Sequence, residues 1–297
     1  MANAREIQSR INSIKSTMKI TNAMYTISSS KLKKARKALT DTEPYFYALQ
    51  STIARIIRHT PDIEDPYFDT RPHIKQKDRK IGYIVVTADK GLAGAYNHNI
   101  FKLAQEQIEK GGQPVLYVVG ELGQQFLSKK GIAVEEDFRY TVQNPNMSRA
   151  RIIEERVVND FLEGRLDEVH MIYTKMVNAI KMEAEIVQLL PVPKTRLESN
   201  IPIDVHLEEI TMKPSPKAVI DAIVPNYIAG FIYGGLVESY SSEQNSRMLA
   251  MQSATKSAQD MLAELAITYN RVRQAAITQE ITEVIGGAKA QKKKKKK

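Results

Sequence analysis

The side chains that most often hold metals or act as nucleophiles are sparse in this chain of 297 residues. It contains no cysteine, which excludes disulfides, thiolate metal sites and thiol regulation. The five histidines are scattered, and no two stand three or four residues apart, the spacing that aligns two ligands on one helix face. Neither the G-x-S-x-G nor the H-E-x-x-H pattern occurs. We therefore expect no catalytic residue and no metal site.

Two glycine-containing turns follow apolar runs that are typical of strands, an order that invites comparison with phosphate-binding loops. Residues 91–94 (Gly-Leu-Ala-Gly) lack the first glycine of G-x-G-x-x-G, and residues 120–123 (Gly-Glu-Leu-Gly) do not match that pattern either. Lys90 precedes its glycine, whereas a Walker lysine follows one. We interpret both segments as tight structural turns and expect no cofactor.

Charged residues gather at a few places. Adjacent carboxylates occur at 135–137 and 154–155, and we expect them to be solvated, as neighbouring charges on helix and loop surfaces usually are. The formal charge of +9 lies at the two ends, because residues 1–40 hold nine basic residues and one acidic residue, and residues 292–297 are all lysine. The basic run Lys31, Lys33, Lys34 and Lys37 is either a solvated helix face or a surface that docks on an acidic protein. A nucleic-acid footprint would need a reading module, and none is visible.

The elements that carry these residues follow from where glycine and proline are missing. The first proline is Pro44, the first glycine is Gly82, and neither type occurs between Leu236 and Ile285. If helical, residues 3–43 and 236–285 would extend roughly 60 Å and 75 Å at about 1.5 Å per residue. Helices of that length are stable when they wind on a partner.

Apolar and small residues in both segments recur at alternating spacings of three and four, which favours a left-handed coiled coil. Because a compact middle brings its own ends together, we expect the two helices to pair antiparallel. Two ordinary amphipathic helices packed on a globular core are the alternative. The expected contact positions are Ile7, Ile11, Ile14, Met18, Thr21, Tyr25, Ser28, Leu32, Ala35 and Leu39, then Met251, Ala254, Ala258, Met261, Leu265, Tyr269, Val272 and Ala276.

The middle of the chain alternates strands with helices, which predicts a Rossmann-like α/β head with a parallel sheet covered on both faces. Ser215 and Pro216 are suited to the N-cap and first position of the C-terminal helix, and Pro225, Gly230, Gly234 and Gly235 would then permit bends. The expected strands are 81–87, 114–119, 132–134 and 168–174, with an antiparallel edge strand at 181–190. Three helices are expected between them: one that ends near 111, one at 124–130 and one at about 148–163.

We divide the chain accordingly. The apolar fraction of 42% and charged fraction of 26% are typical of soluble globular proteins. No apolar run approaches the roughly 20 residues of a transmembrane helix, and residues 1–6 lack the apolar core of a signal peptide. The expected segments are a coiled-coil helix (1–59), a linker (60–79), the α/β head (80–208), a second coiled-coil helix (209–291) and a basic tail (292–297).

Three segments resemble the gamma subunit of bacterial F-type ATP synthases. The first lies within residues 10–32 and includes Lys-Ile-Thr-Asn-Ala-Met at 19–24. The second is Thr-Ala-Asp-Lys-Gly-Leu-Ala-Gly at 87–94. The third lies within residues 242–281 and ends in Tyr-Asn-Arg-Val-Arg-Gln-Ala-Ala-Ile-Thr-Gln-Glu-Ile at 269–281, a highly specific match.

The resemblance implies a non-catalytic rotor shaft at the cytoplasmic face of the bacterial cell membrane. Its paired terminal helices would enter a ring of three alpha and three beta subunits, and its head would stand on the membrane c-ring beside the epsilon subunit. Rotation of the c-ring would then be coupled to ATP synthesis or hydrolysis at the beta subunits, with no nucleic acid, no transmembrane segment and no cofactor in this chain.

The resemblance also implies residue roles. Arg273, Gln274, Thr278 and Glu280 would contact loops inside the beta ring. Met24, Glu243 and Arg247 would lie where the two helices meet each other and the beta subunits. The basic run at 31–37 would face acidic loops of beta. Met212-Lys213 departs from the family pattern of an aromatic residue followed by an acidic one, which puts that c-ring contact in doubt.

Two other function classes remain open at this point. One is a basic coiled-coil scaffold or nucleic-acid-binding protein, for which steeply salt-dependent DNA binding would be diagnostic. The other is a nucleotide-dependent enzyme built on the α/β head, for which tight ATP or NAD binding by the head would be diagnostic.

Overall fold

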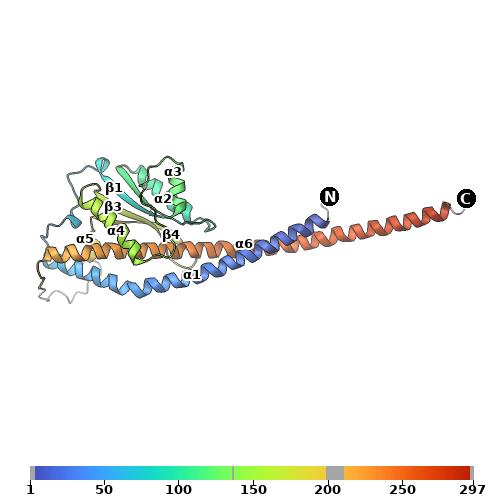
Figure 1. Cartoon of the computed structure of the whole chain (residues 1–297), viewed down its shortest axis with the longest axis horizontal. Helices are drawn as coiled ribbons and strands as arrows, with labels where there is room; N and C mark the ends of the chain where they lie inside the picture. The colour runs from blue at the N-terminus through green and yellow to red at the C-terminus, as the bar shows by residue number, and fades with distance from the viewer. Residues whose placement is uncertain (1–3, 136, 199–210, 295–297) are drawn as a thin grey trace. The chain divides into compact units, whose positions relative to one another are not determined.

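The computed structural model describes residues 4–135, 137–198 and 211–294, and its longest elements are two helices (Figure 1). Helix α1 covers Ala4–His59 and helix α6 covers Pro216–Lys294. The two predicted long helices are confirmed, and both extend beyond the runs that lack glycine and proline. The predicted start of α6 is also confirmed, because the backbone N–H of Ala218 donates to the hydroxyl of Ser215 at 3.2 Å.

The chain divides into two compact units, which are described separately. One unit consists of residues 1–27 and 248–297, and the other of residues 28–247. Helices α1 and α6 each run through both units. The five segments expected from the sequence follow changes of composition and secondary structure, and their boundaries stay a prediction.

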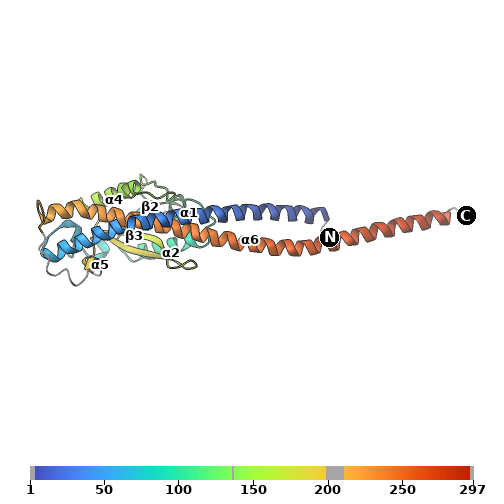
Figure 2. The same cartoon turned by 90° about the horizontal axis from the view of Figure 1, so that it is seen from below.

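In the first unit, α1 and α6 pair antiparallel (Figure 2). The hydroxyls of Thr21 and Thr255 lie 2.7 Å apart. Tyr269, further along α6, lies beside residues 4–16, which come before Thr21 on α1, so the two helices run in opposite directions. Ile7, Ile11 and Thr21 are buried in this pairing. The buried positions of α1 recur every 3.5 residues on average, as the coiled-coil pattern predicts.

The predicted contact is wrong at four positions. One is Ala276, which is exposed because it lies beyond Tyr269, where the described part of α1 begins. Tyr25, Ala254 and Met261 are exposed, and their neighbours Met24, Thr255 and Leu262 are partly buried in their place. In a heptad pattern the next contact position lies three or four residues further along the helix. In this sequence an apolar or small residue stands at both of these positions, so either one fits the pattern. The 3.5-residue period was therefore predictable from the sequence, but the choice between adjacent residues was not.

The second unit contains a four-stranded sheet of order β2-β1-β3-β4. Strands β1 (Lys80–Val86), β2 (Gln113–Val119) and β3 (Glu168–Met176) are parallel, and β4 (Met182–Leu190) is an antiparallel edge strand. The predicted parallel sheet and its antiparallel edge are confirmed. The predicted strand at 132–134 is wrong, because these residues form no strand; next to them, the N–H of Glu135 donates to the carbonyl of Leu116 at 3.0 Å.

Helices cover both faces of the sheet. Helices α2 (Tyr96–Glu109) and α3 (Glu121–Lys129) pack on the face that includes Tyr83 and Val85. Helix α4 (Met147–Leu162) packs on the other face together with residues of α1 and α6. The predicted linker holds two short 3-10 turns, Pro66–Phe68 and Gln76–Asp78, and α5 spans Lys194–Glu198.

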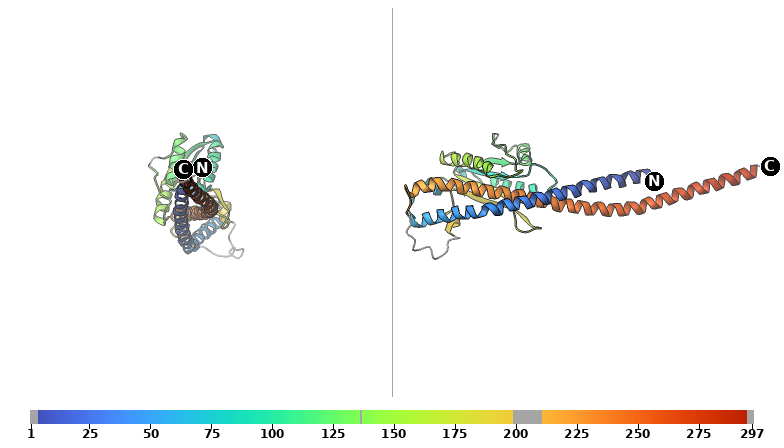
Figure 3. Two further views of the ribbon diagram at one scale, coloured as in Figure 1. Left: turned by 90° about the vertical axis from the view of Figure 1, so that its right-hand side faces the viewer. Right: turned by 60° about the horizontal axis from the view of Figure 1, so that its bottom comes forward.

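Within this unit α6 lies between the sheet and α1 (Figure 3). A side chain at Gly235 would meet the Met171 sulfur of β3 at 2.8 Å, and one at Gly230 would meet the Phe46 ring of α1 at 2.0 Å. The glycines predicted to permit bends lie instead inside a continuous helix, and these two permit close packing. Although α6 is apolar and long enough to span a membrane, 56% of its most apolar stretch is buried in the fold.

The glycine turn at 120–123 packs on Thr87 and Ala88, which lead from β1 into the other glycine turn. Gly120 has a φ of +99°, and a Cβ there would lie 2.3 Å from the carbonyl oxygen of Thr87. The hydroxyl of Thr87 donates to the carbonyl of Val119 at 2.9 Å and accepts from the N–H of Gly123 at 3.1 Å. Gly120 and Gly123 therefore serve a close contact with Thr87, as the structural interpretation of their turn predicts, whereas a Cβ at Gly91 or Gly94 would meet nothing within 4 Å.

We expect the Gly120→Ala variant to lose about 2–4 kcal/mol of unfolding free energy, because it combines a strained φ with a backbone clash. Gly91→Ala is the matched control, since Gly91 lies in the neighbouring turn with nothing within 4 Å of a built Cβ. Chemical denaturation of both variants measures the difference. Equal stabilities would contradict the close contact between Gly120 and Thr87.

Candidate functional site

Helix α6 carries a buried ion pair in the second unit. Glu243 and Arg247 stand one helical turn apart, their side chains are almost fully buried, and Arg247 Nη1 lies 2.7 Å from Glu243 Oε1. Arg247 also donates from Nη2 to the carbonyl oxygens of Lys90 at 3.0 Å and Gly91 at 3.1 Å. One guanidinium therefore joins a buried carboxylate to the turn after β1. A buried charge of this kind is tolerated only when it is paired and hydrogen-bonded.

The same part of α6 binds the end of β3. The hydroxyl of Ser239 accepts from the N–H of Thr174 at 3.3 Å, and Ser242 donates to the carbonyl of Thr174 at 3.1 Å. Ser239 also lies 2.7 Å from the hydroxyl of Tyr96 on α2. Asn245 donates to the carbonyl of Ala179, in the turn between β3 and β4, at 2.8 Å.

These contacts lie where α/β folds commonly bind ligands. The chain leaves β1 toward β2 and later enters β3 on the opposite side of β1, so the connections diverge between β1 and β3. The crevice at the carboxyl ends of two such strands is the usual nucleotide site. Here Ser239 and Ser242 of α6 contact Thr174 near the end of β3, and Arg247 contacts Gly91 in the turn after β1. The arrangement therefore serves to hold α6 on the sheet.

Burial controls the electrostatics of the pair. Burial raises the pKa of Glu243 above its ordinary value, while the nearby charges of Arg247 and, more weakly, Lys31 oppose the rise. The second carboxylate oxygen of Glu243 is buried and makes no hydrogen bond among the described residues. The carboxylate therefore depends mainly on Arg247 for its charge compensation.

The structure brings together only part of the predicted coupling group. Glu243 and Arg247 form the ion pair, whereas Met24 belongs to the first unit and is partly buried beside the paired helices. The resemblance alone had singled out Glu243 and Arg247. The run of buried polar residues around them, from Ser239 to Asn245, was missed, although consecutive polar residues at 241–245 after a largely apolar stretch of the helix are a visible signal.

The predicted ring-contact residues lie on the outer part of α6, in the first unit. Arg273, Gln274, Thr278 and Glu280 are exposed, as is every other side chain from 273 to 289. Because α1 begins at Ala4 beside Tyr269, the described chain provides no second helix for this stretch (Figure 2). Exposed apolar residues recur on it at 277, 281, 284 and 285, the spacing of a helix face that packs on a partner.

The predicted basic run lies on α1 in the second unit. The buried face of this part of α1 includes Ala35 and the partly buried Leu32 and Leu39. The side chains of Lys33, Lys34 and Lys37 are exposed. Lys31 is partly buried and its charge acts on Glu243, so it differs from the other three. The exposed basic surface is therefore made by Lys33, Lys34 and Lys37.

The remaining predicted contact precedes α6. Met212 is partly buried against the core of the second unit, and Lys213 is exposed. Residues 199–210, just before it, lie outside the described residues, as do Lys295 to Lys297 of the basic tail.

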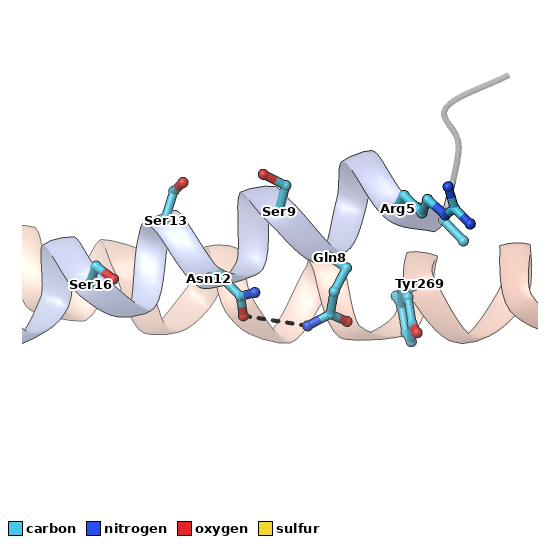
Figure 4. Close-up of a pocket in the computed structure, with 8 residues that line it drawn as sticks. Arg5, Gln8, Ser9, Asn12, Ser13, Ser16 and Tyr269 are labelled. Atoms are coloured by element: carbon cyan, nitrogen blue, oxygen red, sulfur yellow. Dashed lines mark hydrogen bonds between the residues drawn. The ribbon is translucent and has the colours of Figure 1, made fainter.

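A polar groove runs along α1 in the first unit, with a volume of about 750 Å³ (Figure 4). Ser9, Ser13 and Ser16 line it together with Gln8 and Asn12, which are hydrogen-bonded to each other at 3.4 Å. The groove is wide and its lining is neutral apart from Arg5. Hydroxyl and amide groups of this kind are suited to polar contacts with a neighbouring surface.

One charged residue departs from the sequence expectation. Glu154 was expected to be solvated together with Glu155, but it is buried on α4 whereas Glu155 is exposed. Burial raises the pKa of Glu154 to about 7, and the charge of Glu155 adds to the rise. The helical period placed Glu154 on the apolar side with Ala150, Val157 and Val158, and that signal could have found it.

Comparisons with known proteins agree on one family. The profile of the family described as ATP synthase matches residues 3–291. The ATP synthase gamma chain of Ruminiclostridium cellulolyticum is 44% identical over 97% of this chain and 98% of its own length. A gamma chain of Acetobacterium woodii described as sodium ion specific is 36% identical, with 97% and 98% covered.

A solved structure has the same fold. A chain from the central stalk and c-ring structure of the Tetrahymena thermophila mitochondrial ATP synthase matches with a TM-score of 0.59 at 24% identity. The match covers 79% of this chain and 99% of that one.

We expect Arg247→Met to lose about 3 kcal/mol of unfolding free energy near pH 8, because Glu243 is left buried without its cation. A carboxyl with a raised folded pKa costs stability as pH rises, so the loss should be smaller near pH 5. Denaturation at both pH values measures this. The double variant Arg247→Met, Glu243→Gln should recover part of the loss, and no recovery would contradict the assigned pairing.

Glu154→Gln should raise the unfolding free energy by about 2 kcal/mol at pH 8 and change it little at pH 4.5. The folded pKa of about 7 lies above the ordinary value, so the cost of ionising Glu154 appears as pH rises through that interval. Thermal or urea denaturation across pH is the measurement. Exposed Glu155→Gln is the control, and an equal gain in that variant would show that burial is not the cause.

Proposed function

Because the chain belongs to the ATP synthase gamma chain family, we propose that it is the central rotor subunit of a bacterial F-type ATP synthase. In this role it couples ion-driven rotation of the membrane c-ring to ATP synthesis or hydrolysis at the beta subunits. The observation that supports the proposal most is the form of α6, which is paired with α1 over part of its length and then continues with every side chain from 273 to 289 exposed. This exposed stretch of α6 is available for contact with partner subunits on every side.

The chain would act by transmitting force, and the ATP chemistry would belong to the beta subunits. A shaft of this kind needs α6 to be held firmly to the rest of the molecule. The Glu243–Arg247 pair and the serine contacts to Thr174 supply that attachment in the second unit. Work passes to a neighbouring subunit when different orientations of the shaft stabilise different states of that subunit.

We assign the exposed stretch of α6 to contact with the beta ring. Arg273 and Glu280 stand on one side of the helix, and Gln274 and Thr278 stand on the adjacent side. The apolar residues at 277, 281, 284 and 285 provide area for packing, while the charged and amide groups provide hydrogen bonds. Rim charges of this type mainly orient partners and set the association rate.

The basic surface of α1 would dock on acidic loops of beta. Lys33, Lys34 and Lys37 form that surface, and the charge of the nearby Lys31 weakly opposes the raised pKa of the buried Glu243. The assembled protein would be peripheral at the cytoplasmic face of the cell membrane, beside the epsilon subunit and on the c-ring. Co-purification of these subunits with the chain from the source membrane tests the assembly.

The two other function classes, a nucleic-acid-binding scaffold and a nucleotide-dependent enzyme, are disfavoured. The relatives described above are ATP synthase gamma chains, so a nucleic-acid-binding scaffold has no support. Helix α6 binds backbone groups of Thr174, near the end of β3, and of the turn after β1, which favours a structural role for this part of the α/β head over an enzyme built on it.

We expect Arg273→Ala, Gln274→Ala to lower coupled turnover about tenfold in a complex assembled with alpha and beta subunits, which corresponds to roughly 1.4 kcal/mol of contact free energy. Stability of the free chain should not change, since both side chains are exposed. Gln259→Ala, on an exposed position of the paired part of α6, is the control. Assembly and turnover equal to the parent protein would contradict the contact assignment.

A further inference from the structure

A cavity of about 180 Å³ opens in the second unit between α1, α6 and β3. It is unrelated to the ion pair and to the surfaces assigned above. Its volume is several times the roughly 30 Å³ that one water occupies in the liquid. Five aromatic side chains contribute to its wall, namely Phe46, Tyr47, Tyr173, Tyr227 and Phe231.

Gly234 of α6 lines the cavity and has open space where a side chain would begin. A Cβ at Gly230 or Gly235 would collide with a neighbour, but one at Gly234 would meet nothing within 4 Å. Close packing therefore does not require Gly234. A glycine inside a helix costs about 1 kcal/mol relative to alanine, so at this position the chain carries that cost and leaves space.

Two carboxylates face the same cavity from different helices. Glu43 projects from α1 and Glu238 from α6, and the described residues that line the cavity include no basic side chain. Burial raises the pKa of Glu238, and the charges of Glu185 and, more weakly, Glu43 add to that rise, although the N–H of Met176 and the charge of Lys175 offset part of it. A cation between the two carboxylates would relieve their repulsion.

From these observations we propose that the cavity binds an organic cation, an ammonium or guanidinium group attached to a short apolar body. The aromatic rings attract the cation through their faces and cover its apolar part. Glu43 and Glu238 compensate its charge, and the open space above Gly234 accepts the apolar end. Because α1 and α6 both contribute to the wall, a bound cation would link the two helices.

The test uses the full chain and two probes of the same shape, 2-phenylethylammonium and neutral 2-phenylethanol, titrated at pH 8 by calorimetry or ligand-observed NMR. We expect the cation to bind about tenfold more tightly than the alcohol. Glu238→Gln should reduce that preference, and Gly234→Leu should abolish binding of both probes by filling the cavity. Equal affinity of the two probes, or no binding of either, would overturn the proposal.

A second variant separates binding from folding. Gly234→Ala should weaken the cation's binding severalfold while raising the thermal midpoint, because it adds helix propensity without a clash. Gly286→Ala is the matched control, since Gly286 is also a helical glycine of α6 with nothing within 4 Å of a built Cβ. It should leave the affinity unchanged. Unchanged affinity in Gly234→Ala would overturn the assignment of this cavity.

Discussion

The close approach of α6 to its neighbours is the constraint on which the rest of the structure depends. In the second unit the helix lies against β3 and α1 at Gly235 and Gly230, where an added Cβ would come within 3 Å of the side chains of Met171 and Phe46. In the first unit it meets α1 through small and polar residues such as Thr21 and Thr255. Small residues shorten the distance between elements but bury less apolar area, so hydrogen bonds and ion pairs must satisfy the polar groups that are buried with them.

That constraint explains why a fold known for nucleotide sites has a mechanical role here. The polar part of α6 must find partners, and the ends of β1 and β3 provide backbone groups at the right place. Arg247 and Ser242 bind those groups, and the crevice thereby becomes an attachment point. The same helix continues through residues 248–294 without a break.

Much of the architecture could be predicted from the sequence. The absence of glycine and proline indicated the long helices, the 3.5-residue period indicated their pairing, and strand–helix alternation indicated the sheet. Predictions failed where tertiary contacts decide between local options, as for Met24 over Tyr25. The role of Gly230 and Gly235 depends on which residues approach them from other elements, and Phe46 and Met171 are distant in sequence. The burial of Glu154 follows from the helical period. It was not predicted because Glu154 and the adjacent Glu155 together resemble a solvated pair of carboxylates.

The central claim is that α1 and α6 turn together as one shaft. The double variant Thr21→Cys, Thr255→Cys allows a direct test in the assembled complex, because the two hydroxyls lie 2.7 Å apart and the chain has no cysteine of its own. Rotation of α1 and α6 as one shaft predicts that oxidation readily forms a disulfide between positions 21 and 255 and leaves ATP-driven turnover intact. Failure to form this cross-link, or loss of turnover on oxidation with recovery on reduction, would contradict it.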